Sequence, residues 1–177
     1  DATATKSFAK SLPGARAATV DEAIAAADII VLALPYGTAL EAASNKALAG
    51  KTVIDISNPV KPDFSGLAIG HTTSAAEEIQ KAAGGAKVVK AFNTIFAQLF
   101  ASPATATAEV PVFIAGNDEQ AVEAVSALVE AAGFKSVKTG GLEAARLVEP
   151  LGMLNIRFGY GLGHGTSIAP NWLALPA

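Results

Sequence analysis

The stretch Val53-Ile54-Asp55-Ile56-Ser57-Asn58-Pro59 decides the fold, together with the similar run Ile29-Ile30-Val31-Leu32-Ala33-Leu34-Pro35-Tyr36 before it. Each is a short apolar segment that stops at a corner containing Pro or Asn, as strands buried on both faces of a parallel sheet do. Ligands of open α/β sheets bind outside the carboxyl ends of the strands. The two corners therefore nominate candidate site residues from the pattern alone: Pro35, Tyr36, Ser57, Asn58 and Pro59.

Length and composition favour one globular domain. The 177 residues suffice for one substantial core. Hydrophobic residues make up 51% of the chain and aromatic residues only 6%, so the apolar residues are mainly Ala, Val, Ile and Leu. This composition suits helices packed on a sheet. A net charge of −3 argues against nucleic acid as a partner. No apolar run approaches the roughly 20 residues that span a bilayer, so we expect a cytoplasmic protein that does not enter the membrane. Without cysteine, and with two histidines far apart in the sequence, no metal site is predicted.

Apolar strands alternate with helical patterns along the chain. Two capping-box spacings, Thr19 with Glu22 and Ser74 with Glu77, predict helix starts. The predicted strands are 15–19, 28–35, 52–57, 87–92, 111–115 and 136–139. The predicted helices are 5–12, 19–27, 37–48, 74–85, 118–132 and a long segment from 142 onward, and 60–72 is a predicted loop. This order predicts a doubly wound α/β fold with a parallel sheet and a helical C-terminal extension.

The beginning of the chain departs from a dinucleotide-binding sheet. Such a sheet starts with a strand that opens into a glycine-rich turn, which holds the pyrophosphate. The glycine-rich tract 159–165 has no register that reads G-x-G-x-x-G, and it follows a predicted helix. Because the first strand is central in the usual order, we expect that the first strand and its glycine-rich turn are missing at the N-terminus of this sequence.

Five motifs follow one another along the chain: Ala33-Leu34-Pro35-Tyr36, Asp55-Ile56-Ser57-Asn58-Pro59, Thr73-Ser74-Ala75-Ala76-Glu77, Lys90-Ala91-Phe92-Asn93-Thr94 and Ala115-Gly116-Asn117-Asp118. In this order they resemble the NADPH-dependent deazaflavin-coenzyme (F-420) reductase family, which includes predicted dinucleotide-binding enzymes and is related to the NADPH-binding domain of six-transmembrane ferric reductases. The Ser-Arg pair that reads the adenosine 2′-phosphate in that family is absent here. A preference for NADP is therefore implied by the resemblance alone.

The resemblance implies a Rossmann-like NAD(P)-binding domain over 1–141, incomplete at its N-terminus, and a helical extension of the same domain over 142–177. It implies hydride transfer between NADPH and a deazaflavin (F-420) or flavin. Such transfer needs mainly positioning and exclusion of water, so no catalytic residue is assigned. The implied cofactor residues are Leu34, Pro35 and Tyr36 on the adenosine side, Ser57, Asn58 and Pro59 at the nicotinamide end, and Asn93 and Thr94 closing the cleft. The substrate-side candidates are Gly152, Met153 and Asn155, with His164, which glycines flank, as a further one.

Other interpretations stay open at this point. Pro35 and Pro59 can simply end strands, and Asn58 or Asn93 can bond to nearby backbone. The same fold also serves reductases of a small carbonyl or imine, of the β-hydroxyacid dehydrogenase or pyrroline carboxylate reductase type, and a non-catalytic dinucleotide-binding sensor. The segment 142–173 has many apolar and glycine residues, so we expect it to pack across the cleft or against a second subunit in a homodimer.

Overall fold

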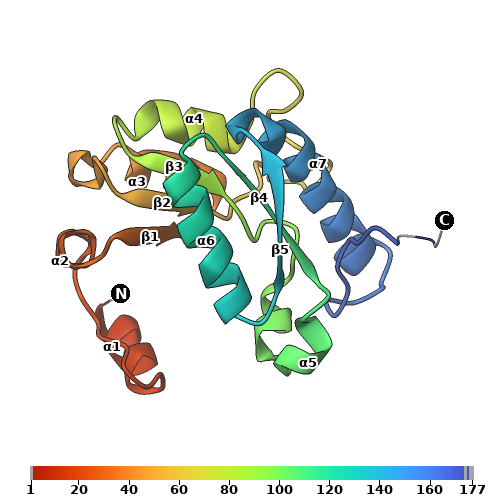
Figure 1. Cartoon of the computed structure of the whole chain (residues 1–177), viewed down its shortest axis with the longest axis horizontal. Helices are drawn as coiled ribbons and strands as arrows, with labels where there is room; N and C mark the ends of the chain where they lie inside the picture. The colour runs from red at the N-terminus through yellow and green to blue at the C-terminus, as the bar shows by residue number, and fades with distance from the viewer. Residues whose placement is uncertain (1, 174, 176–177) are drawn as a thin grey trace.

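The computed structural model describes residues 2–173 and 175. Within these residues five strands form one sheet in the spatial order β1-β2-β3-β4-β5 (Figure 1). The strands are β1 (Ile29–Leu32), β2 (Thr52–Asp55), β3 (Lys87–Lys90), β4 (Pro111–Gly116) and β5 (Lys135–Gly140). The α-helices are α1 (Ala2–Lys10), α2 (Val20–Ala26), α3 (Tyr36–Ala43), α4 (Ala75–Ala82), α5 (Ala104–Thr107), α6 (Glu119–Ala131) and α7 (Ala145–Ile156). Shorter helical turns are η1 (Lys46–Leu48), η2 (Ala97–Ala101), η3 (Leu142–Ala144) and the π-helical η4 (Arg157–Gly161).

The predicted α/β fold class is confirmed, with one correction to the sheet. Strands β1, β2 and β3 are parallel, and β4 is parallel to β5, but β4 runs antiparallel to β3. The antiparallel contact covers the pairs Val89 with Gly116 and Lys90 with Ala115. The connection from β3 to β4 carries only the short η2 and α5 and re-enters the sheet from the edge at which β3 ends. No helix carries the chain back across the sheet there, so the next strand points the opposite way.

Both faces of the sheet are covered, as a doubly wound fold requires. Val53 and Val88 pack with α3 and α4 in one apolar cluster, while Ile54 and Val89 pack with α6 in another. This alternation is the two-residue period of a strand applied to a sheet buried on both sides. In Figure 1, α6 crosses in front of the strands. The carboxyl ends of β1, β2 and β3 therefore meet at one edge, between two helical layers.

The predicted helix starts are confirmed by their caps. The Thr19 side chain accepts a hydrogen bond from the backbone N–H of Glu22 at 3.3 Å, and Glu22 Oε2 accepts one from the Thr19 N–H at 2.8 Å. The Ser74 hydroxyl accepts from the Glu77 N–H at 3.2 Å at the start of α4. These caps use only residues three apart, which is why the sequence reveals them.

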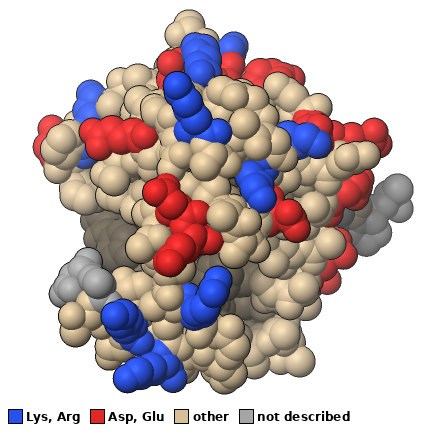
Figure 2. Space-filling view, turned by 90° about the vertical axis from the view of Figure 1, so that its left-hand side faces the viewer, with Lys and Arg blue, Asp and Glu red and all other residues tan. Residues whose placement is uncertain are grey.

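The predicted strand 15–19 is wrong. This segment joins α1 to α2 without regular structure, and β1 is the edge of the sheet in the part of the chain that the structure describes. A strand needs a hydrogen-bonded neighbouring strand, and this segment pairs with none of the strands in the described residues. Figure 2 shows the β1 side of the molecule, with charged groups of both signs scattered over the surface.

The C-terminal extension is helical only in part. Helix α7 and η4 end at Gly161, and the described residues after it are irregular, so the prediction of a helical segment from 142 is confirmed over its first half. None of the helices in the described residues is both long and apolar enough to cross a membrane.

Candidate functional site

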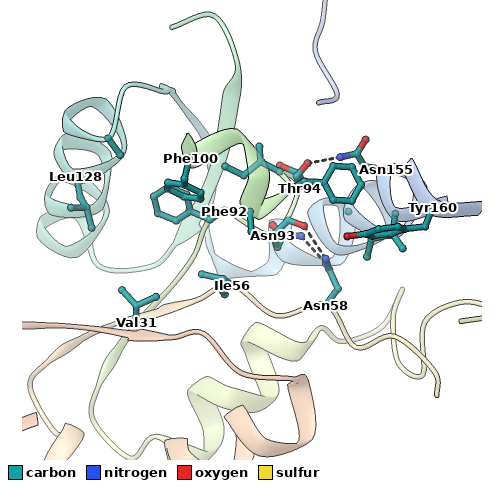
Figure 3. Close-up of a pocket in the computed structure, with 16 residues that line it drawn as sticks. Val31, Ile56, Asn58, Phe92, Asn93, Thr94, Phe100, Leu128, Asn155 and Tyr160 are labelled. Atoms are coloured by element: carbon teal, nitrogen blue, oxygen red, sulfur yellow. Dashed lines mark hydrogen bonds between the residues drawn. The ribbon is translucent and has the colours of Figure 1, made fainter. Parts of the chain in front are cut away.

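Two asparagines from different strand corners are joined at the carboxyl edge of the sheet. The side-chain amide Nδ2 of Asn58, after β2, donates to the backbone carbonyl of Asn93, after β3, at 2.8 Å. Asn93 Nδ2 donates to Asn58 Oδ1 at 2.8 Å and to the carbonyl of Val148 on α7 at 3.0 Å. Figure 3 shows these bonds at the centre of the site. We call Asn58 and Asn93 the amide pair.

Helix α7 closes over the amide pair through a glycine. A Cβ at Gly152 would lie 2.7 Å from Asn58 Oδ1 and 2.8 Å from the Asn93 carbonyl, so only glycine allows this approach without a shift. One turn further along α7, Asn155 Nδ2 donates to the carbonyl of Thr94 at 3.0 Å. The structure thus brings Gly152 and Asn155, which the sequence analysis placed on the substrate side, against the predicted cofactor residues.

A cavity of about 470 Å³ opens beside the amide pair. Its wall is mostly apolar and aromatic and includes Phe92, Phe96, Phe100 and Tyr160. Polar atoms come from the amide pair, Thr94 and Asn155 at one side (Figure 3). Sites for flat conjugated ligands are commonly built this way, with apolar walls and a few placed polar groups. The described lining residues include no His, Lys, Arg, Asp or Glu.

Three buried polar atoms at this edge have no hydrogen-bond partner among the described residues: Ser57 Oγ, Asn93 Oδ1 and Thr94 Oγ1. Most buried polar side-chain atoms in proteins are paired, so three such atoms on neighbouring corners call for an explanation. Asn93 Oδ1 can only accept a hydrogen bond, while the two hydroxyls can donate or accept. Asn93 and Thr94 line the cavity, so their side chains offer one acceptor and one hydroxyl beside it, whereas Ser57 does not line it.

The backbone turns at Phe92, directly before Asn93. The Phe92 φ of 61° lies in the left-handed region, where an aromatic residue is strained. The Phe92 ring packs against Phe100, with ring centroids 5.8 Å apart. The turn directs the chain from β3 into the Asn93-Thr94 corner.

A buried ionic network lies beneath the amide pair. Lys90 Nζ, fully buried, contacts Asp55 Oδ2 at 2.7 Å and Glu149 Oε1 at 2.9 Å, and it donates to the Ser57 carbonyl. Glu149 also accepts from the N–H groups of Ala75 and Ala76 at the start of α4, at 2.9 and 3.1 Å. We call Asp55, Lys90 and Glu149 the buried ionic network.

Sequence reasoning did not select the buried ionic network. One signal was available: Asp55 and Lys90 are charged residues inside otherwise apolar strands, where burial demands a partner. Glu149 gives no such signal, because it lies in an amphipathic helix. Among the described residues, no group of three or more His, Asp or Glu is placed to hold a metal ion.

The predicted adenosine-side residues lie at the same sheet edge but outside the cavity. Pro35 is the N-cap of α3 and offers no side-chain acceptor, and Leu34 is partly exposed before it. Burial raises the pKa of the Tyr36 phenol above its ordinary value, and the nearby carboxylates of Glu78, Glu149 and Asp55 raise it further. The Tyr36 hydroxyl therefore stays protonated at neutral pH and can donate a hydrogen bond.

Four other predicted residues also lie outside the cavity. Ser57 is buried beneath it, and its carbonyl accepts a hydrogen bond from Lys90 Nζ. In the loop after β2, the Pro59 carbonyl accepts a hydrogen bond from the Ala68 N–H at 2.6 Å. Met153 lines a neighbouring groove with Phe64 and Arg157. His164 is exposed and packs its ring against Phe158, with centroids 5.6 Å apart. Tyr160, which the sequence analysis did not name, lines the cavity instead.

Comparisons with known proteins agree with this architecture. A family model described as NADP oxidoreductase coenzyme F420-dependent matches residues 1–59. A crystal structure from Arthrobacter sp. FB24, described as a proposed F420-dependent NADP reductase, superposes with a TM-score of 0.77 at 31% identity, over 93% of this chain and 82% of that one. An imine reductase from Streptomyces aurantiacus has the same fold, with a TM-score of 0.58 at 20% identity, over 88% of this chain and 51% of that one.

Two curated relatives are longer than this chain. The metalloreductase STEAP3 of Rattus norvegicus is 33% identical over 135 residues, which are 74% of this chain and 26% of the relative. The F420-dependent NADP reductase of Methanothermobacter thermautotrophicus is 28% identical over 143 residues, which are 76% of this chain and 61% of the relative. The chain therefore spans only part of the length of both relatives.

Proposed function

Because the chain belongs to the family of coenzyme F420-dependent NADP oxidoreductases, we propose that it binds NADPH at the carboxyl edge of the sheet and transfers a hydride between the nicotinamide and a deazaflavin (F420) or flavin. The observation that carries this proposal is the aromatic cavity beside the amide pair, together with the unpartnered Asn93 Oδ1 and Thr94 Oγ1 of two of its lining residues. A flat ring with a polar substituent matches both features.

The residues present fit a nicotinamide. Its carboxamide has N–H donors, which suit Asn93 Oδ1, and a carbonyl, which suits the hydroxyl of Thr94; both residues line the cavity. The apolar wall suits the ring itself. When bound, NADPH supplies the hydride. The chain then has to orient the ring, exclude water and hold the acceptor face to face with it.

The lining of the cavity favours ring-to-ring transfer over carbonyl chemistry. Reduction of a carbonyl or imine needs a proton donor beside the reacting atom. Among the described lining residues, the Tyr160 hydroxyl is the one titratable group, and that side chain is largely exposed. A reductase of small carbonyls or imines is therefore the second candidate, with Tyr160 as its donor.

The test uses the full-length protein and follows the nicotinamide absorbance of NADPH, with F420, FMN and FAD offered in turn. Acceptor-dependent oxidation supports the proposal and ranks the acceptors. Oxidation seen only with a carbonyl or imine, and lost in Tyr160→Phe, supports the second candidate. NADPH binding without oxidation of any acceptor refutes both and leaves a dinucleotide sensor.

A matched pair of variants connects the activity to the cavity. We expect Asn93→Ala to raise the Kd for NADPH at least about tenfold, which is about 1.4 kcal/mol of binding free energy. Asn171→Ala is the control, because Asn171 is exposed and does not line the cavity; its side chain bonds to the Glu109 carbonyl at 3.4 Å and to the neighbouring Trp172 N–H at 2.8 Å. Equal NADPH affinity in the two variants contradicts the placement of the cofactor. Thermal unfolding of both variants separates lost binding from lost stability.

We also propose that the protein is a homodimer through α7. Leu147, Leu151, Leu154 and Phe158 follow one another at intervals of four, three and four residues and so share one helical face. Leu147 is 76% exposed and Leu154 is 48% exposed. An apolar row of this length on the surface is typical of an interface between subunits.

A further inference from the structure

The ammonium group of Lys90 is buried, and its partners are all groups of this chain. Its N–H groups donate to Asp55 Oδ2 and to the Ser57 carbonyl, and it also forms an ion pair with Glu149 Oε1 at 2.9 Å. The side chain has no exposed surface. Lys90 therefore cannot pair with a phosphate or donate a proton to a substrate, and any effect it has on the site acts through its neighbours.

The buried ionic network contains two carboxylates and one ammonium. The start of α4 balances the excess negative charge, because two of its N–H groups donate to Glu149 and its dipole places partial positive charge there. The N-terminus of α4 is thus filled by the protein's own carboxylate. Each charged group in the network therefore has a fixed partner, either a backbone or a side-chain atom.

The network contacts each of the three segments that meet at the amide pair. Ser57, which precedes Asn58, is held on both sides: its carbonyl accepts from Lys90, and its N–H donates to Asp55 Oδ1 at 2.9 Å. Lys90 lies three residues before Asn93, and Glu149 directly follows Val148, whose carbonyl accepts from Asn93. One ion cluster therefore sets the relative positions of β2, β3 and α7 beneath the amides.

Stability alone does not explain why these positions carry charges. A buried ion pair costs so much desolvation that apolar residues of similar volume are often as stable. Apolar residues, however, do not fix the direction of a carbonyl or an N–H group. The strained Phe92 lies between Lys90 and Asn93, and a strained turn persists where both of its ends are held.

We infer that Lys90, with Asp55 and Glu149, is a positioning residue: it holds the amide pair in the orientation that receives the carboxamide of the nicotinamide. This inference rests on the proposed function, since it concerns how the proposed cofactor site is oriented. It assigns the buried ionic network a role in cofactor selectivity rather than in the transfer of the hydride.

The test replaces the central pair by uncharged residues in Asp55→Val with Lys90→Met. Glu149 keeps its bonds to α4 in this double variant, so we expect it to fold. The side-chain amide signals of Asn58 and Asn93 are followed by ¹⁵N NMR, and binding is measured for NADP and for its acetylpyridine analogue, which lacks the N–H donors. The matched control is Glu109→Val with Lys135→Met, which removes an exposed Lys–Glu pair at 3.0 Å.

We expect the double variant to lose the Asn58 and Asn93 side-chain amide signals of the wild type. Its affinity ratio for NADP over the analogue should fall by at least about tenfold, while its thermal midpoint stays near that of the wild type. The control variant is expected to keep the amide signals and the preference. A folded double variant that keeps both overturns the inference, because a merely structural network would leave them unchanged.

A second variant tests the inference if the double variant does not fold. Glu149→Gln keeps the size of the side chain and one oxygen for α4 while removing one charge from Lys90. We expect a partial loss of the amide signals and of the preference for NADP, and an unchanged pattern of both overturns the inference. If the wild type binds neither NADP nor the analogue, the proposed function fails, and the amide signals still decide whether the network positions the pair.

Discussion

Replacement of Gly152 by alanine perturbs the closest contact between α7 and the amide pair. In an open helix this substitution stabilises the protein by about 1 kcal/mol, because glycine loses more backbone freedom on folding. Here the added Cβ would lie 2.7 Å from Asn58 Oδ1, 2.8 Å from Asn58 Nδ2 and 2.8 Å from the Asn93 carbonyl. We therefore expect the opposite sign at this position.

The magnitude follows from the distances. Ordinary contact begins near 3.4 Å, so the Asn58 amide has to retreat by roughly 0.7 Å. That shift breaks the two bonds of 2.8 Å that join Asn58 to Asn93. Each buried bond left unmade costs about 1–2 kcal/mol. After the gain in helix propensity is subtracted, the expected loss of unfolding free energy is about 1–3 kcal/mol.

The assay is thermal unfolding together with NADPH titration. For a chain of this size, we expect the midpoint to fall by about 2–4 °C for each kcal/mol lost, and the Kd for NADPH to rise about tenfold or more. Gly161→Ala is the control, because its Cβ would meet only Arg157 Cγ at an ordinary 3.6 Å. A Gly152→Ala protein that is as stable as the wild type and binds NADPH equally well refutes the reasoning.

Three further predictions concern other parts of the molecule. We expect Phe92→Gly to be more stable than Phe92→Ala by about 1 kcal/mol in chemical denaturation, because glycine adopts the φ of 61° without strain; equal stability contradicts this. Hydrogen bonds from Arg146 hold the pKa of Glu77 below its ordinary value of 4.5. The Arg146–Glu77 pair therefore stabilises the folded protein above pH 4.5, and this contribution is lost as the pH falls through the lowered pKa of the folded state. The difference in thermal midpoint between wild type and Arg146→Ala should therefore shrink in acid, and a difference that does not change with pH argues against the pair as its source. Light scattering should show a dimer that Leu147→Glu with Leu154→Glu converts to monomers, and a monomeric wild type excludes the α7 interface.

Much of the candidate site could be predicted because it lies at strand ends. Asn58 and Asn93 each follow an apolar run, and parallel strands bring their carboxyl ends to the same edge. The placement of Gly152 and Asn155 opposite them came from the family resemblance, and the structure brings these residues together. Tyr160 was missed, since an exposed aromatic residue in a glycine-rich tract gives no local signal of its neighbours.

The sequence by itself determined the elements whose causes are local. The predicted strands 28–35, 52–57 and 87–92 formed as the shorter strands 29–32, 52–55 and 87–90, and the Thr19 and Ser74 caps began helices. Both results have local causes, because burial pattern and capping depend on residues a few positions apart. Tertiary structure decided the direction of β4, which depends on where the connection re-enters the sheet, and the failure of 15–19 to form a strand, which depends on a neighbour. It also decided the buried ionic network, because residues 55, 90 and 149 meet only when two strands and a helix pack together and water is excluded from their charges.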